Sequence, residues 1–241
     1  FKSITAFRTF DGEFFNDNDG APQPVSQLID IFEHEQFSQE FQLLGTAFED
    51  RLKWILGAYY FEEDGKNINP VRFSQAHIQS GGYFDSDSWA IFGQGTYEIT
   101  DKLSLTIGLR YTEDTKRYLP DQFFEFFPIG PLPLPPCPGT GLPCGVGDRV
   151  LPYVEETTDA EELTPMVNLA YRWNNSFMTY LTYSDGFQGG GFTQRLFPPD
   201  ASLPAFDPEF VQSSALGFKY DGWSYTLRRN GAVFCAEYTA I

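Results

Sequence analysis

The chain has 241 residues, a formal net charge of −17 and a mean hydropathy of −0.31. This negative charge disfavours nucleic acid as a partner, because nucleic acids are bound by basic surfaces. No run approaches the roughly 18 consecutive apolar residues of a transmembrane helix, although aromatic residues make up 17% of the chain.

Nine β-strands are predicted, because runs rich in aromatic and β-branched residues recur between polar segments. They are expected near 1–10, 37–48, 52–63, 88–99, 103–112, 163–173, 176–185, 208–220 and 223–240. Short links would then fall at 49–51, 100–102, 174–175 and 221–222, and long links at 11–36, 64–86, 118–161 and 186–207. This alternation predicts an all-β, antiparallel up-and-down meander with two unlike ends, as in a partial transmembrane β-barrel of about nine strands.

The last predicted strand contains a competing signal. Asn230-Gly231 is typical of a two-residue hairpin turn. A single strand over 223–240 is preferred, because its length matches the other long strands and a hairpin would break the alternation of the links.

The clearest strand pattern lies at 103–112, where apolar and polar or small residues alternate with a period of two. The apolar set is expected to face lipid and consists of Leu103, Leu105, Ile107, Leu109 and Tyr111. On the same register Gln94, Arg110 and Arg172 are expected to point into a water-filled barrel interior. Aromatic residues near strand ends would form girdles at the two membrane boundaries; they include Tyr59, Tyr60, Phe61, Tyr111, Tyr171, Trp173, Trp223 and Tyr225. The alternative is a soluble β-sandwich with an aromatic core.

The acidic residues concentrate in the predicted long links. They include Asp11, Glu13, Asp17, Asp19, Glu62, Glu63, Asp64, Asp85, Asp87, Glu155, Glu156, Asp159, Glu161 and Glu162. One interpretation is a negative vestibule that attracts cations, and the other is a set of solvated loops kept soluble by charge.

Three cysteines are present. Cys137 and Cys144 flank a Pro/Gly-rich segment, and a disulfide between them is expected if the chain lies in an oxidising compartment. A metal pair is the alternative, but no histidine is near and the spacing fits no zinc pattern. Cys235 lies on a predicted strand and is expected to be an inert thiol that is buried or faces lipid.

No catalytic, cofactor-binding or metal-binding residues are predicted. The two histidines, His34 and His77, lie in or beside predicted long links, and neither a Gly-x-Ser-x-Gly elbow nor a His-Glu-x-x-His helix occurs. Adjacent carboxylates such as Glu62 and Glu63 would point to opposite faces of a strand. The glycines at 186–191 lack the lysine and the helix of a phosphate-binding loop.

Three motifs together resemble the TonB-dependent receptor barrels. Residues 183–192 read YSDGFQGGGF and are similar to the family signature Y-S-x-G-F-x-x-G-G-F. Residues 92–97 (FGQGTY) and 105–111 (LTIGLRY) resemble the family hairpin FGQ-x-x-Y … L-T-x-G-x-R-Y. Asp207-Pro208-Glu209 followed by Leu216-Gly217-Phe218-Lys219 resembles its P-E … E-L-G-x-K strand, although Ala215 stands where the family usually has glutamate.

The resemblance implies an active importer in the outer membrane of a Gram-negative bacterium. Such receptors bind iron–siderophore complexes, haem, cobalamin or glycans, and the iron–siderophore branch is the most similar here. They work with the TonB–ExbB–ExbD complex, which acts on a plug domain and its TonB box. A passive porin-like barrel and an outer-membrane barrel enzyme, such as a lipase or protease, remain the alternatives.

The family barrel has 22 strands, whereas nine are predicted here, with no plug, TonB box or signal peptide. The chain is therefore expected to be an incomplete barrel domain over 1–241. Alone, it is expected not to transport, because an open sheet leaves two unpaired edges in lipid. Neither the ligand nor its contact residues can be assigned from the sequence.

Overall fold

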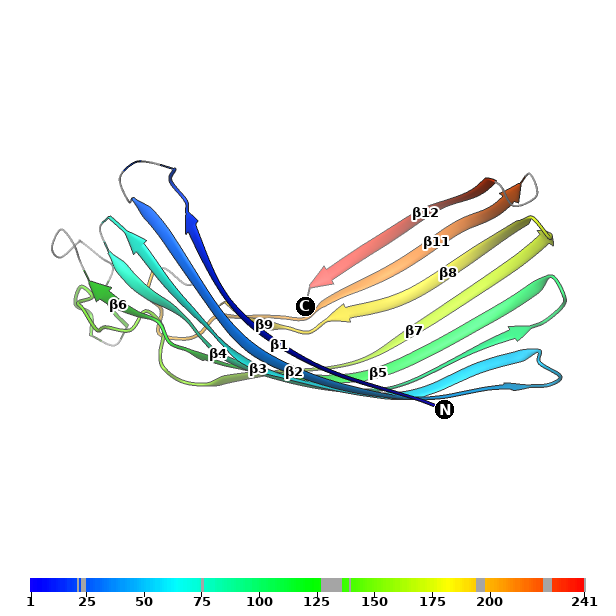
Figure 1. Ribbon diagram of the computed structural model, residues 1–241, viewed down its shortest axis with the longest axis horizontal. Helices are drawn as coiled ribbons and strands as arrows, with labels where there is room; N and C mark the ends of the chain where they lie inside the picture. Colours follow the sequence, from blue (N-terminus) through cyan, green and yellow to red (C-terminus); the bar gives the residue numbers. More distant parts are fainter. Residues whose placement is uncertain are drawn as a thin grey trace.

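The computed structural model describes residues 1–20, 22, 25–74, 76–126, 136–138, 140–193, 198–222 and 227–240. Ten strands form one bent antiparallel sheet in the order β1-β2-β3-β4-β5-β7-β8-β11-β12, and β6 pairs with β4 (Figure 1). A separate hairpin joins β9 to β10. The strands are β1 (Lys2–Asp17), β2 (Ser26–Ala47), β3 (Leu52–Phe73), β4 (His77–Glu98), β5 (Leu103–Pro120), β6 (Phe123–Phe126), β7 (Glu156–Asn174), β8 (Phe177–Gln188), β9 (Gly191–Phe192), β10 (Ala205–Phe206), β11 (Glu209–Gly222) and β12 (Leu227–Ala240).

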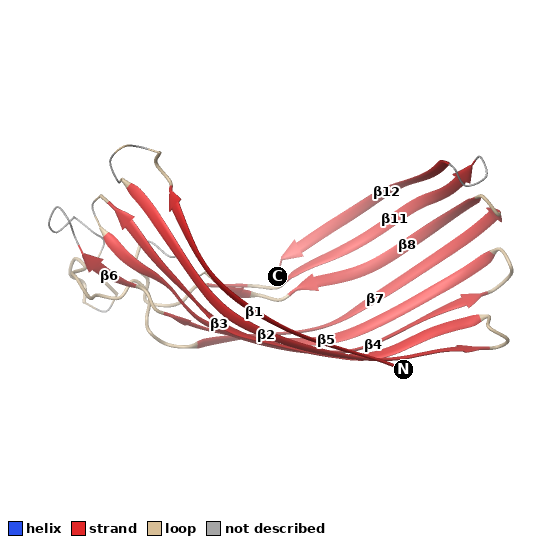
Figure 2. Cartoon of the chain, viewed as in Figure 1, coloured by secondary structure: helices blue, strands red, loops and turns tan. Residues whose placement is uncertain are grey.

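All regular elements of the described residues are strands, as Figure 2 shows. The nine-strand meander predicted from the sequence is confirmed, and Asn230-Gly231 lies within the continuous strand β12. The described residues contain no helix long and apolar enough to cross a membrane.

Two of the four predicted long links are wrong. β1 continues to Asp17 and β2 begins at Ser26, while β3 continues to Phe73 and β4 begins at His77. Predicted loop residues such as Glu62 and Asp87 are therefore paired strand residues. The backbone ladder of an antiparallel sheet needs no apolar side chains, so these strands continue where the hydrophobic alternation stops. The strict alternation of short and long links is lost with them.

The other two long links are largely confirmed. Between β5 and β7 lies a long connection whose described residues include one strand, β6, and between β8 and β11 lies one whose described residues include β9 and β10. The short link predicted at 221–222 is wrong, because both residues belong to β11; the next residues, 223–226, lie outside the described part of the chain. We call the end of the sheet that carries the long connections the loop end, and the opposite end the turn end.

The two faces of the sheet differ in shape and chemistry. Side chains from β1, β2, β4 and β5 line one common cavity with the segment after β8, which is possible only on a concave face. The opposite, convex face carries a belt of exposed apolar side chains. This belt includes Leu43, Leu56, Ile91, Ile107, Leu109, Leu163, Leu181 and Leu216.

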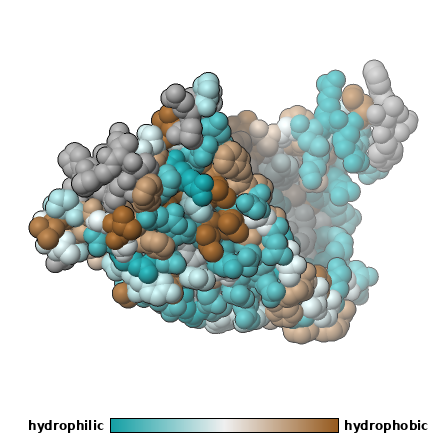
Figure 3. All heavy atoms as spheres, turned by 60° about the vertical axis from the view of Figure 1, so that its left-hand side comes forward, coloured by the Kyte–Doolittle hydropathy of each residue, from teal (hydrophilic) through white to brown (hydrophobic). Residues whose placement is uncertain are grey.

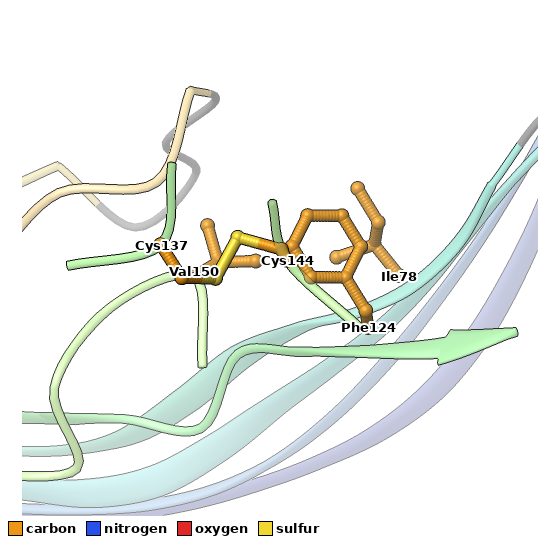
Figure 4. Packing of buried hydrophobic residues seen from close by; sticks show 5 residues of the cluster. All are labelled: Ile78, Phe124, Cys137, Cys144 and Val150. Carbon is orange, nitrogen blue, oxygen red and sulfur yellow. A yellow bond between two sulfur atoms is a disulfide. The ribbon is translucent and has the colours of Figure 1, made fainter. Parts of the chain in front are cut away.

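The buried core lies at the loop end rather than along the middle of the sheet. One cluster contains Ile78, Phe124, Cys137, Cys144 and Val150, and Figure 4 shows the Cys137–Cys144 disulfide beside Val150 and the Phe124 ring. A second cluster joins Tyr118 of β5 to Leu151 and Leu203 of the two long connections, with Phe84 and Phe192 packed against it. The two connections therefore form one packed layer, which we call the cap (residues 136–138, 140–155 and 189–193 with 198–208).

Backbone hydrogen bonds tie the cap together. The Val150 amide donates to the Gln122 carbonyl at 3.0 Å, and the Asp200 amide donates to the Val150 carbonyl at 2.9 Å. A single sheet with an exposed apolar belt is not a β-sandwich, so that alternative is excluded.

Candidate ligand-binding site

The concave face holds a cavity of about 590 Å³ at the loop end. Its size lies within the range of about 300–1,000 Å³ that is usual for ligand pockets. The lining residues are Arg8, Phe10, Phe14, Phe32, His34, Glu63, Asn67, Phe84, Ser86, Lys116, Arg117, Tyr118, Gln188, Gly189, Gly190, Gly191, Phe192 and Phe206. Figure 3 shows this end of the molecule, where hydrophilic and hydrophobic side chains are interspersed.

Aromatic rings form much of the cavity wall. Phe10 and Phe14 stack at 6.4 Å between ring centroids, and Phe32 meets the Phe14 ring edge at 6.3 Å. Across the cavity Tyr118 stacks on Phe192 at 6.4 Å. The strand register explains this arrangement, because alternate residues of β1, β2 and β5 point to the same face.

Most polar groups in the wall are hydrogen-bond donors. Arg8, His34 and Lys116 contribute nitrogen atoms, and Glu63 is the only carboxylate among the lining residues. Asn67 is almost completely buried, and its amide nitrogen has no hydrogen-bond partner among the described residues. Such a wall suits a ligand with aromatic or apolar parts and acceptor oxygens, and it is not the negative vestibule that the sequence offered as one interpretation.

Tyr118 contributes a protonated hydroxyl to this environment. Burial of its side chain, together with the nearby Asp121 carboxylate, raises the pKa of the Tyr118 phenol well above its ordinary value. The hydroxyl therefore stays neutral over the whole physiological range and can act as a donor.

The segment after β8 closes one side of the cavity. Gly189, Gly190 and Gly191 are lining residues, and the short β9–β10 hairpin pairs Gly191 with Phe206. From the sequence, this glycine run was expected to allow tight curvature of the backbone. The structure adds that a Cβ atom at Gly190 would lie 2.6 Å from the Phe206 carbonyl oxygen, so the backbones approach too closely for a side chain.

The acidic residues mostly lie on the convex face, above the apolar belt. Arg117 of β5 donates to Asp87 at 2.8 Å and also contacts Asp85, both on β4. Hydrogen bonds to these two carboxylates raise the pKa of the Arg117 guanidinium, and the bond to Asp87 has the larger effect.

Glu62 and Glu63 point to opposite faces, as expected from the strand geometry. Glu62 accepts from the Tyr60 hydroxyl on the convex face, and Glu63 lines the cavity.

The register places the five residues expected to face lipid together. Leu103, Leu105, Ile107, Leu109 and Tyr111 share the convex face. Gln94, Arg110 and Arg172 lie on the concave face, where the Arg110 guanidinium is 5.5 Å from the Tyr59 ring centroid. Tyr60 is convex but Tyr59 and Phe61 are concave, so only part of that aromatic cluster can join a girdle; Trp223 and Tyr225 lie outside the described residues.

The histidines and cysteines occupy separate places. His34 lines the cavity, whereas His77 begins β4 and packs against the Phe126 ring at 5.7 Å. Cys137 and Cys144 are joined in a disulfide inside the cap, and Cys235 is exposed on β12. Among the described residues no group of three or more histidine, cysteine, aspartate or glutamate side chains is placed to hold a metal ion.

Comparison with known proteins gives a consistent result. A family model described as "TonB dependent receptor-like, beta-barrel" matches residues 2–232. The ferric yersiniabactin uptake receptor FyuA from Yersinia pestis superposes with a TM-score of 0.72 and 14% identity, covering 97% of this chain and 32% of that receptor. The siderophore receptor PiuA from Acinetobacter baumannii gives 0.62 and 14%, with 96% and 36% covered. The alcaligin outer membrane receptor FauA from Bordetella pertussis gives 0.59 and 15%, with 98% and 33% covered.

At such identities the three structures show a shared fold. The chain spans about a third of the length of each of them.

Proposed function

This chain belongs to the TonB-dependent receptor β-barrel family, and on that premise we propose that it forms part of the wall of an outer-membrane receptor that imports an iron–siderophore complex. The family is one of transport receptors rather than enzymes. The observation that carries the proposal is the cavity at the loop end, where aromatic rings and cationic donors meet on the concave face.

The convex face supports a membrane location. An apolar belt this exposed would be an unusually large hydrophobic patch for a soluble protein, and Ile107 and Leu109 are 54% and 48% exposed. From Leu103 to Tyr111 the belt follows nine residues of β5, which matches the roughly 9–11 residues that a tilted strand needs to cross a bilayer. We take the covering partner to be outer-membrane lipid.

Carboxylates above the belt mark its outer boundary. The Tyr111 hydroxyl lies 2.7 Å from a Glu113 oxygen and 2.9 Å from a Glu161 oxygen, so the two carboxylates share its one proton, and the Trp89 indole nitrogen donates to Glu113 at 3.1 Å. Tyrosine and tryptophan are favoured at membrane–water interfaces because they have an apolar body and a polar tip. In this orientation the loop end, with the cavity and the cap, faces the outside.

The ligand is inferred from the cavity wall. Donors at Arg8, His34, Lys116 and Asn67 suit an anionic chelate with exposed oxygens, and the phenylalanine rings suit its aromatic or apolar parts. The same fold occurs in solved siderophore receptors, which supports a siderophore complex as the ligand class. Uptake would also need the TonB–ExbB–ExbD complex, acting through a plug and TonB box that we place outside this chain.

Uptake measured in cells tests the proposal. The native gene product is expressed in an iron-starved Gram-negative host that lacks its own siderophore receptors, and import of radiolabelled ferric siderophores is followed with and without TonB. We expect saturable import that stops when TonB is deleted. Import that survives the deletion would favour a passive porin, and hydrolysis of an ester or peptide probe would favour the barrel enzyme.

A further inference from the structure

Lys116 of β5 makes a polar contact between the cap and the sheet. Its ammonium nitrogen donates to the Gly190 carbonyl oxygen at 2.9 Å and to the Gly189 carbonyl oxygen at 3.2 Å. The same nitrogen lies 3.5 Å from the Asp114 carboxylate, two residues away on the same strand and face. The Lys116 side chain thus binds the backbone of the two residues that directly follow β8.

The contacts engage most of the donor capacity of the lysine. An ammonium group has three N–H donors and no acceptor; the two carbonyls accept two of them, and the Asp114 carboxylate forms an ion pair with the same group. The side chain is 33% exposed and lines the cavity. An anionic ligand at Lys116 would therefore compete with the two cap carbonyls and the Asp114 carboxylate for the ammonium group.

The glycines make this junction close-packed. A Cβ atom at Gly189 would collide with the Asp114 carboxylate, and one at Gly191 would lie 2.7 Å from the Phe206 ring. Gly189, Gly190, Phe192 and Phe206 all line the cavity. We call residues 189–193 with 205–206 the strap, since five of these residues line the cavity: Gly189, Gly190, Gly191, Phe192 and Phe206.

We propose that Lys116 is a positioning residue that latches the strap across the cavity, and that an anionic ligand releases the strap by taking over the Lys116 ammonium. This inference rests on the proposed function for the ligand, but the latch itself is a property of the unliganded protein. It assigns a role to the glycine run that local curvature alone did not explain.

The test compares four forms of the native gene product in detergent micelles. They are the parent, Lys116→Met, Lys116→Arg and the control Lys66→Met. Lys66 of β3 is a matched control, because its side chain is also 33% exposed and ion-paired, to Glu33 at 2.9 Å. Its position in the register puts it on the convex face. The readout is amide hydrogen exchange at 189–193, measured by mass spectrometry with and without a ferric tris-catecholate complex as probe.

Without the probe we expect Lys116→Met to raise exchange at 189–193 on the order of tenfold, as for the loss of a charge-assisted hydrogen bond. Lys116→Arg should restore most of the protection, and Lys66→Met should match the parent. Heat-modifiable gel mobility checks that each variant is folded. Unchanged exchange in a folded Lys116→Met protein would overturn the latch.

With the probe we expect exchange at 189–193 to rise in the parent and not to rise further in Lys116→Met. Quenching of tryptophan fluorescence reports whether the chelate binds. Binding without a rise in exchange would overturn the release step and leave the proposed function standing. An absence of binding would count against both the release step and this ligand class, whereas the probe-free comparison would still decide the latch.

Discussion

Leu109 and Arg110 are adjacent in β5 yet occupy opposite environments. Leu109 is exposed on the convex face, and the Arg110 guanidinium lies 5.7 Å from the Phe92 ring centroid on the concave face, where its Nε donates to Thr112 at 3.0 Å. The pleat of the strand separates an apolar exterior from a polar interior within a single peptide unit.

This separation gives the first prediction. Leu109→Arg in the native gene product should lower the free energy of unfolding in a lipid bilayer by about 2–4 kcal/mol, because the new charge would lie on the lipid side near the bilayer centre. Gln94→Arg is the matched control, since Gln94 faces the concave side opposite Gly108, and it should change stability little. Urea unfolding in vesicles measures both; equal effects would contradict the assignment of the faces.

The cap gives the second prediction, because it has a core of its own. Phe124 is fully buried in the disulfide cluster, whereas Phe126, on the same short strand, is 53% exposed. Phe124→Ala should destabilise the cap by about 3–5 kcal/mol through the cavity it leaves, and Phe126→Ala should cost much less.

Amide exchange at Val150, whose N–H donates to Gln122, measures the opening of the cap. Exchange within the membrane part of β5 provides the internal reference and should not change. If both variants opened the cap equally, the buried cluster would not be what holds it.

The sequence predicts the belt region of this fold well because its two faces differ in chemistry. The apolar convex face and the polar concave face require the alternation at Leu103–Tyr111, and the alternation in turn sets the register of the neighbouring strands. Above the belt both faces meet water. There Glu62, Glu63 and Asp64 show no apolar alternation, and the sequence predicted a loop where β3 continues.

The cavity could not be predicted for a different reason. Phe10, Phe84, Tyr118 and Phe192 belong to four distant segments and meet only through the curvature of the sheet. No local pattern distinguishes them from the other aromatic residues. The contact of Lys116 could not be predicted either, because its partners are backbone carbonyls of the strap.

The third prediction concerns the cysteines in the native protein. If the protein is secreted to an oxidising compartment, Cys137 and Cys144 should stay bridged. Cys235 lies on the convex face in the strand row of Ile107, so the maleimide is added after denaturation without reductant, where Cys235 alone of these three cysteines should react. Among the peptides that cover residues 1–241, mass spectrometry should then find one label before reduction and three after it. Three labels on the unreduced protein would show that the bridge does not form.

Reduction should also loosen the cap. The bridge closes a short loop, with a sequence separation of 7, and the loop-entropy relation gives about 2–3 kcal/mol for such a length. Faster amide exchange at Val150 after reduction, and unchanged exchange in β7, is the expected pattern. A Cys137→Ser variant should behave like the reduced protein.

The last prediction tests the cationic wall of the cavity. Arg8 lines the cavity from β1, so Arg8→Gln should weaken binding of an anionic ferric chelate on the order of tenfold, the loss expected for one charge-assisted contact. Arg72→Gln is the matched control, because it removes the same charge from an exposed position on the convex side of β3. Fluorescence titration at two salt concentrations measures both, and the Arg8 effect should shrink at high salt. Since the two variants have the same net charge, equal loss of affinity would mean that the chelate responds to the overall charge of the protein and not to this cavity.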